Sequence, residues 1–127
     1  MKMDLQPQHK DDRGEICDLL VNESIDAITR ISFSKGAVRA NHYHKLTTQW
    51  TYVTSGKLIY ASRGVDGVVD TIKEEVLLAG DMVVSLPNEV HAFKAVDESE
   101  ILVFTKGPRA GFDYELDTFR LEVPLIK

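Results

Sequence analysis

Residues 36–50 read Gly36-Ala37-Val38-Arg39-Ala40-Asn41-His42-Tyr43-His44-Lys45-Leu46-Thr47-Thr48-Gln49-Trp50. His42 and His44 are separated by one residue, and alternate side chains of a β-strand point to the same face. We therefore expect the two imidazoles side by side, as two ligands of one metal ion would lie. A short turn after Leu46 would return Gln49 on the neighbouring strand, facing the same space.

A third nitrogen ligand is expected from a distant segment of the chain. The sequence has four histidines, and His91 follows a turn-forming Pro-Asn pair in Leu86-Pro87-Asn88-Glu89-Val90-His91. Three neutral imidazoles and an amide oxygen suit a divalent transition metal such as zinc, iron, manganese, nickel or cobalt. The predicted site for one such ion consists of His42, His44, Gln49 and His91.

The composition is that of a single soluble domain of 127 residues, 43% of them hydrophobic and 28% charged. The net charge of −5, with no run of basic residues, argues against a nucleic-acid partner. The single cysteine, Cys17, excludes an internal disulfide and fits a reducing compartment. No apolar run approaches the roughly 18 residues of a membrane span, and residues 1–13 lack a signal-peptide core. We expect a cytoplasmic protein without a membrane partner.

Short β-type segments separated by turn residues fill the chain after Gly14, and none shows convincing helical periodicity. The ambiguous segment is Lys73–Ala79. Ten such strands predict an all-β barrel or sandwich. The predicted strands are Glu15–Val21, Ala27–Ser34, Ala37–His44, Gln49–Thr54, Lys57–Arg63, Val68–Glu75, Asp81–Leu86, His91–Ala95, Glu100–Lys106 and Phe119–Pro124.

The same residues resemble the two motifs of the cupin superfamily. The first motif, Gly-x5-His-x-His-x(3,4)-Glu-x6-Gly, is matched in spacing throughout by Gly36, His42, His44, Gln49 and Gly56. Gln49 stands where the motif has glutamate. The second motif, Gly-x5-Pro-x-Gly-x2-His-x3-Asn, is matched more loosely by Gly80, Pro87 and His91. The resemblance covers roughly residues 28–106.

This resemblance implies a single-domain cupin jelly-roll β-barrel, also called a double-stranded β-helix, over residues 14–127. A polar segment, 1–13, would precede it, and its C-terminal part would include a loop segment, 107–118. An isolated His-x-His pair is more often merely solvated, but inside this motif a metal site is favoured. A neutral Gln49 leaves the charge of the ion available for Lewis-acid chemistry. Similar three-histidine, one-glutamine cupins include polyketide cyclases and enzymes that linearise unsaturated uronates.

The leading functional hypothesis is an isomerase or lyase-type enzyme that polarises a carbonyl of a small polyhydroxylated, sugar-like substrate. The chain is also similar to sugar 3,4-ketoisomerases in Asp12-Arg13-Gly14, Arg39, His42-Tyr43-His44-Lys45 and Gln49. Those enzymes use the two histidines as acid and base without metal, so His42 and His44 are candidate catalytic residues in either case. An iron or manganese dioxygenase and a non-catalytic ligand-binding cupin remain open alternatives. A homodimer is expected.

Further candidates come from the flanking strands. Glu89 and Tyr60 are candidate catalytic groups, a loop carboxylate and an acid near the barrel mouth. The candidate substrate-binding residues are Arg30, Arg39 and Phe93. Arg30 would enter the barrel only if Ile31 and Phe33 did not, whereas Phe93 shares the parity of His91. Trp50 and Tyr52 are expected to face away from the metal. In the 107–118 loop, the residues that would close over a ligand or contact a second subunit are Arg109, Asp113 and Tyr114.

Overall fold

The computed structural model describes residues 1–67, 71–108 and 115–127. The described chain forms an antiparallel β-structure with one turn of 3-10 helix at residues 115–117. Its strands are β1 (His9–Asp11), β2 (Gly14–Ile16), β3 (Ala27–Phe33), β4 (Val38–Tyr43), β5 (Thr48–Ser55), β6 (Lys57–Gly64), β7 (Lys73–Leu78), β8 (Met82–Ser85), β9 (Glu89–Ala95), β10 (Ser99–Lys106) and β11 (Phe119–Arg120).

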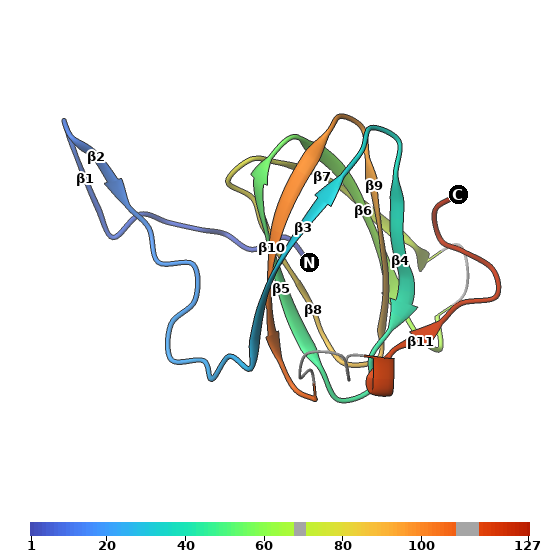
Figure 1. The fold of residues 1–127 in the computed structure, drawn as a ribbon. Coiled ribbons are helices and arrows are strands. Elements are labelled where there is room, and N and C mark those ends of the chain that lie inside the picture. Colours follow the sequence, from blue (N-terminus) through green and yellow to red (C-terminus); the bar gives the residue numbers. More distant parts are fainter. Residues whose placement is uncertain (68–70, 109–114) are drawn as a thin grey trace.

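Two sheets face each other and enclose the interior of the barrel (Figure 1). One sheet has the order β3-β10-β5-β8, and the other has the order β11-β4-β9-β6-β7. Consecutive strands such as β4 and β5 therefore lie in opposite sheets, and strands distant in sequence become neighbours. This is the crossing pattern of a jelly roll, and it confirms the predicted fold class.

The β1–β2 hairpin projects from the side of the barrel (Figure 1). The first residues of the chain instead run beside β8, since the N-terminal ammonium donates to the carbonyl of Val84 and the amide of Met3 donates to that of Met82. Residues 4–8 and 18–23 line a groove at Trp50, on the outer face of β5. Trp50 thus faces away from the interior, as strand parity predicted.

Strand β1 was not predicted, and three predicted strands differ from the observed ones by more than two residues at one end or both. The strand predicted for Glu15–Val21 ends at Ile16, because its only partner is the three-residue β1. The strand predicted for Phe119–Pro124 ends at Arg120, after which the chain binds Asn41 instead of a ladder. The strand predicted from Val68 begins at Lys73, residues 68–70 lying outside the described chain. The ambiguous segment 73–79 is strand β7, paired along its length with β6.

The apolar core fills one end of the barrel and leaves the other end for polar side chains. Along β9, Ala95 and Phe93 belong to the core, while the next inward position is His91. The remaining buried core side chains are those of Phe33, Val53, Leu58, Tyr60, Leu77, Val83, Ile101 and Val103. Within the described ranges, no helix has the length and hydrophobicity that a membrane crossing requires.

Candidate metal centre

A β-bulge in β4 places two parts of the strand on the same inner face. The pairing of β4 with β9 shifts between Ala40 and His42, where Ala40 and Asn41 have φ angles of 72° and 56°. Such left-handed backbone is typical of a bulge residue and is tolerated best by Gly and Asn. Arg39 pairs with the inward Phe93, so strict alternation would turn the side chain of His42 outward. The bulge restores it to the interior.

The three histidines of the predicted site converge inside the barrel. His42 lies near the end of β4, and His44 follows the last residue of that strand. His91 is directly opposite His42 on β9. The ring centroids are 4.7 Å apart for His42–His44 and for His42–His91, and 5.4 Å apart for His44–His91. One nitrogen from each ring lies within 4.8 Å of the other two. His44 and His91 are buried, and His42 is partly buried.

Backbone carbonyls orient two of the rings. The Nδ1 atom of His44 bonds the carbonyl of Asp117 at 2.8 Å, and that of His91 bonds the carbonyl of Glu89 at 3.1 Å. Because a carbonyl only accepts, each Nδ1 carries a hydrogen, and in the neutral ring Nε2 keeps its lone pair. This arrangement, a ring fixed through one nitrogen with the other aimed at the site, is typical of metal-ligating histidine.

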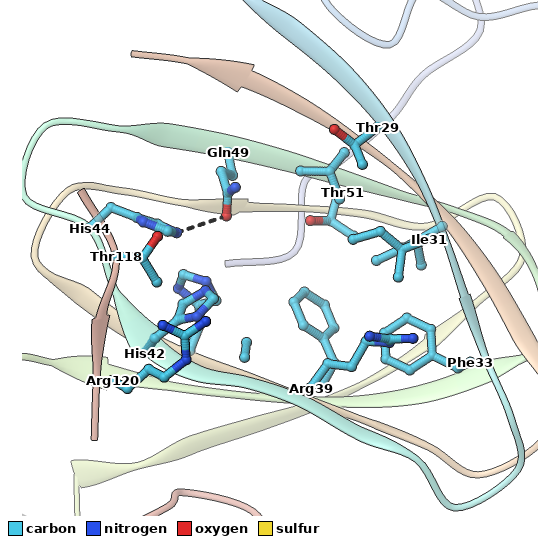
Figure 2. A pocket seen from close by; sticks show the side chains of 15 residues that line it. Thr29, Ile31, Phe33, Arg39, His42, His44, Gln49, Thr51, Thr118 and Arg120 are labelled. Atoms are coloured by element: carbon cyan, nitrogen blue, oxygen red, sulfur yellow. Dashed lines mark hydrogen bonds between the residues drawn. The ribbon is translucent and has the colours of Figure 1, made fainter. Parts of the chain in front are cut away.

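Gln49 completes the donor set from the facing sheet. Its Oε1 atom lies 3.2 Å from Nε2 of His44 (Figure 2). In the neutral His44 ring with its hydrogen on Nδ1, both of these atoms are acceptors. Either a rotation of the amide by 180° or a cation between the two atoms satisfies both of them. Three imidazoles and an amide oxygen fit a divalent transition metal, so these four residues could hold one.

Burial keeps two of the imidazoles neutral. Desolvation, followed by the neighbouring His44 and Arg120, lowers the pKa of His42 to about 4, against a smaller opposing effect of Glu115. Desolvation, followed by His42 and His44, lowers the pKa of His91 to about 3. Neutral imidazole is the form that binds metal ions. At neutral pH both rings are therefore ready to act as ligands.

Asp117 fastens the turn that joins the two parts of the site. Its buried carboxylate accepts hydrogen bonds from the amides of Lys45 and Leu46 and from the hydroxyl of Thr47, at 2.8–3.0 Å. Burial alone would raise the pKa of Asp117, but the hydrogen bonds from Leu46, Thr47 and Lys45 lower it. The same residue therefore fixes the His44 ring through its carbonyl and the 45–47 turn through its side chain.

A cavity of about 440 Å³ extends from the histidines into the barrel. In Figure 2, His42, His44 and Gln49 lie at one end, and Arg39 reaches toward Phe33 at the other. The guanidinium of Arg39 donates to the carbonyl of Ser32 at 3.1 Å and lies 5.4 Å from the ring centroid of Phe33. The remaining lining residues are Thr29, Ile31, Ala40, Thr51, His91, Phe93, Ile101, Val103, Thr118 and Arg120.

Two of the predicted substrate-binding residues, Arg39 and Phe93, line this cavity, but Arg30 does not. Arg30 lies on the outer face of β3 with its side chain 74% exposed, 3.6 Å from Glu100. Its neighbours Ile31 and Phe33 occupy the interior, so the prediction that Arg30 enters the barrel is wrong.

The candidate catalytic groups Tyr60 and Glu89 lie beside the cavity and do not line it. The Tyr60 hydroxyl is fully buried, 2.8 Å from Ser85 Oγ, and donates to Glu89 Oε1 at 3.3 Å. Burial, with the nearby charge of Glu89, raises the pKa of Tyr60. We therefore regard this pair as support for the ring of His91, which is hydrogen-bonded to the Glu89 carbonyl.

Sequence reasoning missed the contribution of the C-terminal segment. Strand β11 pairs with β4 so that Phe119 opposes Tyr43 and Arg120 opposes His42. Phe119 stacks on Tyr43, whereas Thr118 and Arg120 line the cavity. No local sequence signal identifies Thr118 and Arg120 as lining residues, because their position depends on the pairing of β11 with β4, two strands more than 70 residues apart in sequence. The predicted lid residues Arg109, Asp113 and Tyr114 lie outside the described residues.

The fold and the site define a small β-barrel protein with a candidate metal centre at the polar end of its interior. A family model described as Cupin matches residues 19–110. The chain therefore belongs to the cupin family, as the motif resemblance implied.

One curated relative and several solved structures are similar to this chain. The pectin degradation protein KdgF of Dickeya dadantii is 27% identical over 79 residues, which cover 62% of this chain. The chain spans 64% of the length of that relative. A 3,4-ketoisomerase from Helicobacter canadensis aligns with a TM-score of 0.75 at 16% identity, covering 95% of this chain and 90% of the other. The rmlC epimerase of Mycobacterium tuberculosis aligns at 0.76 with 13% identity, over 94% and 67%. These structural likenesses show a shared fold.

Proposed function

We propose that this cupin is a metal-dependent enzyme that acts on a small, polyhydroxylated, sugar-like substrate in an isomerase or lyase-type reaction. The observation that carries the proposal is the convergence of three imidazole nitrogens and the Gln49 oxygen at the end of a cavity. The relatives, a pectin degradation protein, a 3,4-ketoisomerase and an epimerase, support a carbohydrate substrate.

The ligand set proposed for one divalent ion is His42, His44, Gln49 and His91. A divalent ion bound there would supply Lewis acidity toward a carbonyl or hydroxyl oxygen, and the neutral Gln49 would leave its charge undiminished. The identity of the ion among zinc, iron, manganese, nickel and cobalt is decided by metal analysis. The cavity itself would orient the substrate between the histidines and Arg39, with Phe93 and Thr51 on its walls.

The second candidate is a metal-free ketoisomerase-like enzyme in which His42 and His44 move the proton. Their rings are 4.7 Å apart, so one could deliver a proton to the carbon next to that from which the other removes it. The low pKa of His42 keeps its ring unprotonated at neutral pH, the form in which a base must start. This mechanism does not need the buried His91, which is why His91 discriminates between the candidates.

The test combines metal content with proton exchange. Protein purified without chelators should carry close to one divalent transition metal per chain, and His42→Ala or His91→Ala should lose most of it. His9→Ala is the matched control, because His9 is exposed on the β1–β2 hairpin and bonds Asp11. Incorporation of solvent deuterium beside the carbonyl of aldose and ketose substrates, followed by NMR, reports turnover.

Exchange that requires the metal and His91 supports the proposal. Exchange that persists in metal-stripped protein and in His91→Ala contradicts it and favours the acid–base pair. Oxygen consumption with the same substrates would instead indicate the dioxygenase alternative, and metal binding without turnover would indicate a ligand-binding cupin. The homodimer and the cytoplasmic location stay predictions, checked by light scattering in solution and by cell fractionation.

A further inference from the structure

Two cationic side chains line the cavity, although the protein as a whole is acidic. Among its lining residues in the described chain, Arg39 and Arg120 are cationic and none is a carboxylate, whereas the whole protein carries a net charge of −5. A concave site lined by one sign of charge concentrates ligands of the opposite sign. A negatively charged group of a ligand would therefore meet cationic side chains in this cavity.

Of the two arginines, Arg120 lies beside the metal centre. It pairs with His42 in the β11–β4 ladder, so the two side chains share the inner face, and Figure 2 shows them next to each other. Arg39 lies toward the opposite end, where the Ser32 carbonyl and the Phe33 ring already engage its guanidinium. An anionic group bound by Arg120 would hold the neighbouring atoms of a ligand close to the histidines.

The guanidinium of Arg120 is already paired with a carboxylate of the chain, that of Glu115. Both oxygens of Glu115 accept from the guanidinium, at 2.6 Å from one nitrogen and 2.7 Å from the other. This two-point pairing is the geometry in which arginine binds carboxylates most specifically. The side chains of Arg120 and Glu115 are 60% and 44% exposed, and such exposed ion pairs contribute little net stability. A ligand carboxylate can therefore replace Glu115 at small cost.

We propose that Arg120 is the anion-binding residue of the cavity, that it receives a carboxylate of the substrate, and that Glu115 is a built-in competitor for that position. This inference rests on the proposed function, because it assigns the acidic class of the sugar-like substrate. In the absence of substrate, the Glu115 carboxylate takes the position of the substrate carboxylate, on the segment that also carries the lining residues Thr118 and Arg120.

Three ligands that differ only at carbon 6 test the proposal: D-glucuronate, D-glucose and glucose 6-phosphate. Their dissociation constants are measured by calorimetry with metal-loaded and with metal-stripped protein. Glucuronate should bind about tenfold tighter than glucose, as expected for one charge-assisted pair. Arg120→Gln should remove that difference, and Glu115→Gln should tighten glucuronate binding several-fold by removing the competitor. The control is the exposed pair of the hairpin, Arg13→Gln and Asp11→Asn, whose ionic contact is also 2.6 Å.

Equal binding of glucuronate and glucose, or no glucuronate binding, would overturn the proposal. Tighter binding of glucose 6-phosphate than of glucuronate would overturn the assignment of a carboxylate. Weaker glucuronate binding in Glu115→Gln would mean that Glu115 orients Arg120 and does not compete. The variants keep the metal ligands, so a negative result here with one metal per chain leaves the proposed function standing, whereas loss of metal binding in the wild type removes that function separately.

Discussion

The imidazole of His44 donates from Nδ1 to the backbone carbonyl of Asp117 at 2.8 Å, although the two residues are 73 positions apart. The Asp117 carboxylate also accepts three hydrogen bonds from residues 45–47. The last segment of the chain thus determines the orientation of a predicted metal ligand and of the turn that leads to Gln49. The candidate ligands come from two facing sheets, with Gln49 on one and the histidines on the other. The hydrogen bonds of Asp117 help to fix the distance between them, because pairing within one sheet does not.

We predict that Asp117→Ala weakens both the fold and the metal centre. The part-buried amides of Lys45 and Leu46 and the buried Thr47 hydroxyl would lose their acceptor, at a cost of roughly 2–3 kcal/mol in the free energy of unfolding. The variant keeps the backbone carbonyl that bonds His44, but the 45–47 turn between His44 and Gln49 would lose its anchor, so metal affinity should fall by up to roughly tenfold. Cobalt titration followed by the visible absorption of the ion measures the second effect. Asp117→Asn should recover part of both.

The control for this prediction is Asp81→Asn. Asp81 accepts the amide of Leu78 in the β7–β8 turn, remote from the histidines. The Asp81→Asn variant should have a lower free energy of unfolding and an unchanged cobalt spectrum. If Asp117→Ala lowers stability but leaves the cobalt affinity and spectrum unchanged, Asp117 serves the fold alone.

We predict that the metal-free protein loses stability as the pH falls from about 6.5 toward 4. The folded-state pKa values of His42 and His91 are about 4 and about 3, below the ordinary value of 6.5. In this range the unfolded chain binds more protons than the folded chain, so acidification favours unfolding. Each histidine contributes at most roughly 1.4 kcal/mol per pH unit.

Urea unfolding in the presence of a chelator, at several pH values between 7.5 and 4.5, measures this slope. His91→Gln should flatten it, since glutamine does not titrate. A slope that is the same in wild type and His91→Gln would mean that His91 is not buried in its neutral form.

The proximity of His42, His44 and Gln49 could be predicted from sequence because their geometry is local, whereas that of His91 followed from the second motif. Strand alternation places His42 beside His44, and a short turn brings back Gln49. The bulge at Ala40 and Asn41 could not be predicted from alternation, and without it Arg39 and His42 would face opposite sides. The sequence also could not supply Thr118 and Arg120, because the pairing of β11 with β4 depends on the tertiary fold.

Strand parity predicts which face of a sheet a side chain occupies, but it does not predict whether that side chain reaches the cavity. Tyr60 and Glu89 are candidate catalytic groups by sequence, but they lie beside the cavity without lining it and bond each other. Arg30 was uncertain because Ile31 and Phe33 could have faced either side. In the structure Phe33 is almost fully buried against Phe93 and Arg39, so the neighbouring positions of β3, including Arg30, face outward.

We predict that Gly56→Ala, at the last position of the first motif, is strongly destabilising. Gly56 has a φ angle of 92°, and a Cβ atom there would lie 2.5 Å from the carbonyl oxygen of Glu98, with Ser99 closer still. The backbone strain and the clash together should cost roughly 3 kcal/mol or more.

The matched control is Gly36→Ala, the first glycine of the motif. Gly36 has a φ angle of 82°, but a Cβ atom would meet nothing within 4 Å. This variant should lose only about 1 kcal/mol, from the strained backbone alone. Equal losses in the two variants, measured by denaturant unfolding, would mean that the contact with the 98–99 turn is not what requires glycine at position 56.

The last prediction concerns Gln49, where the chain departs from the motif. Gln49→Glu should keep or tighten metal binding, because a carboxylate is a stronger ligand than an amide, but it should lower turnover by quenching part of the charge of the ion. Gln49→Met, similar in size but without the oxygen, should weaken metal binding. In metal-stripped Gln49→Glu, the new anion 3.2 Å from the ring of His44 should favour protonated imidazole, which NMR titration of the histidines detects. Unchanged metal affinity, histidine titration and turnover in Gln49→Glu would place residue 49 outside the site and contradict the proposed ligand set.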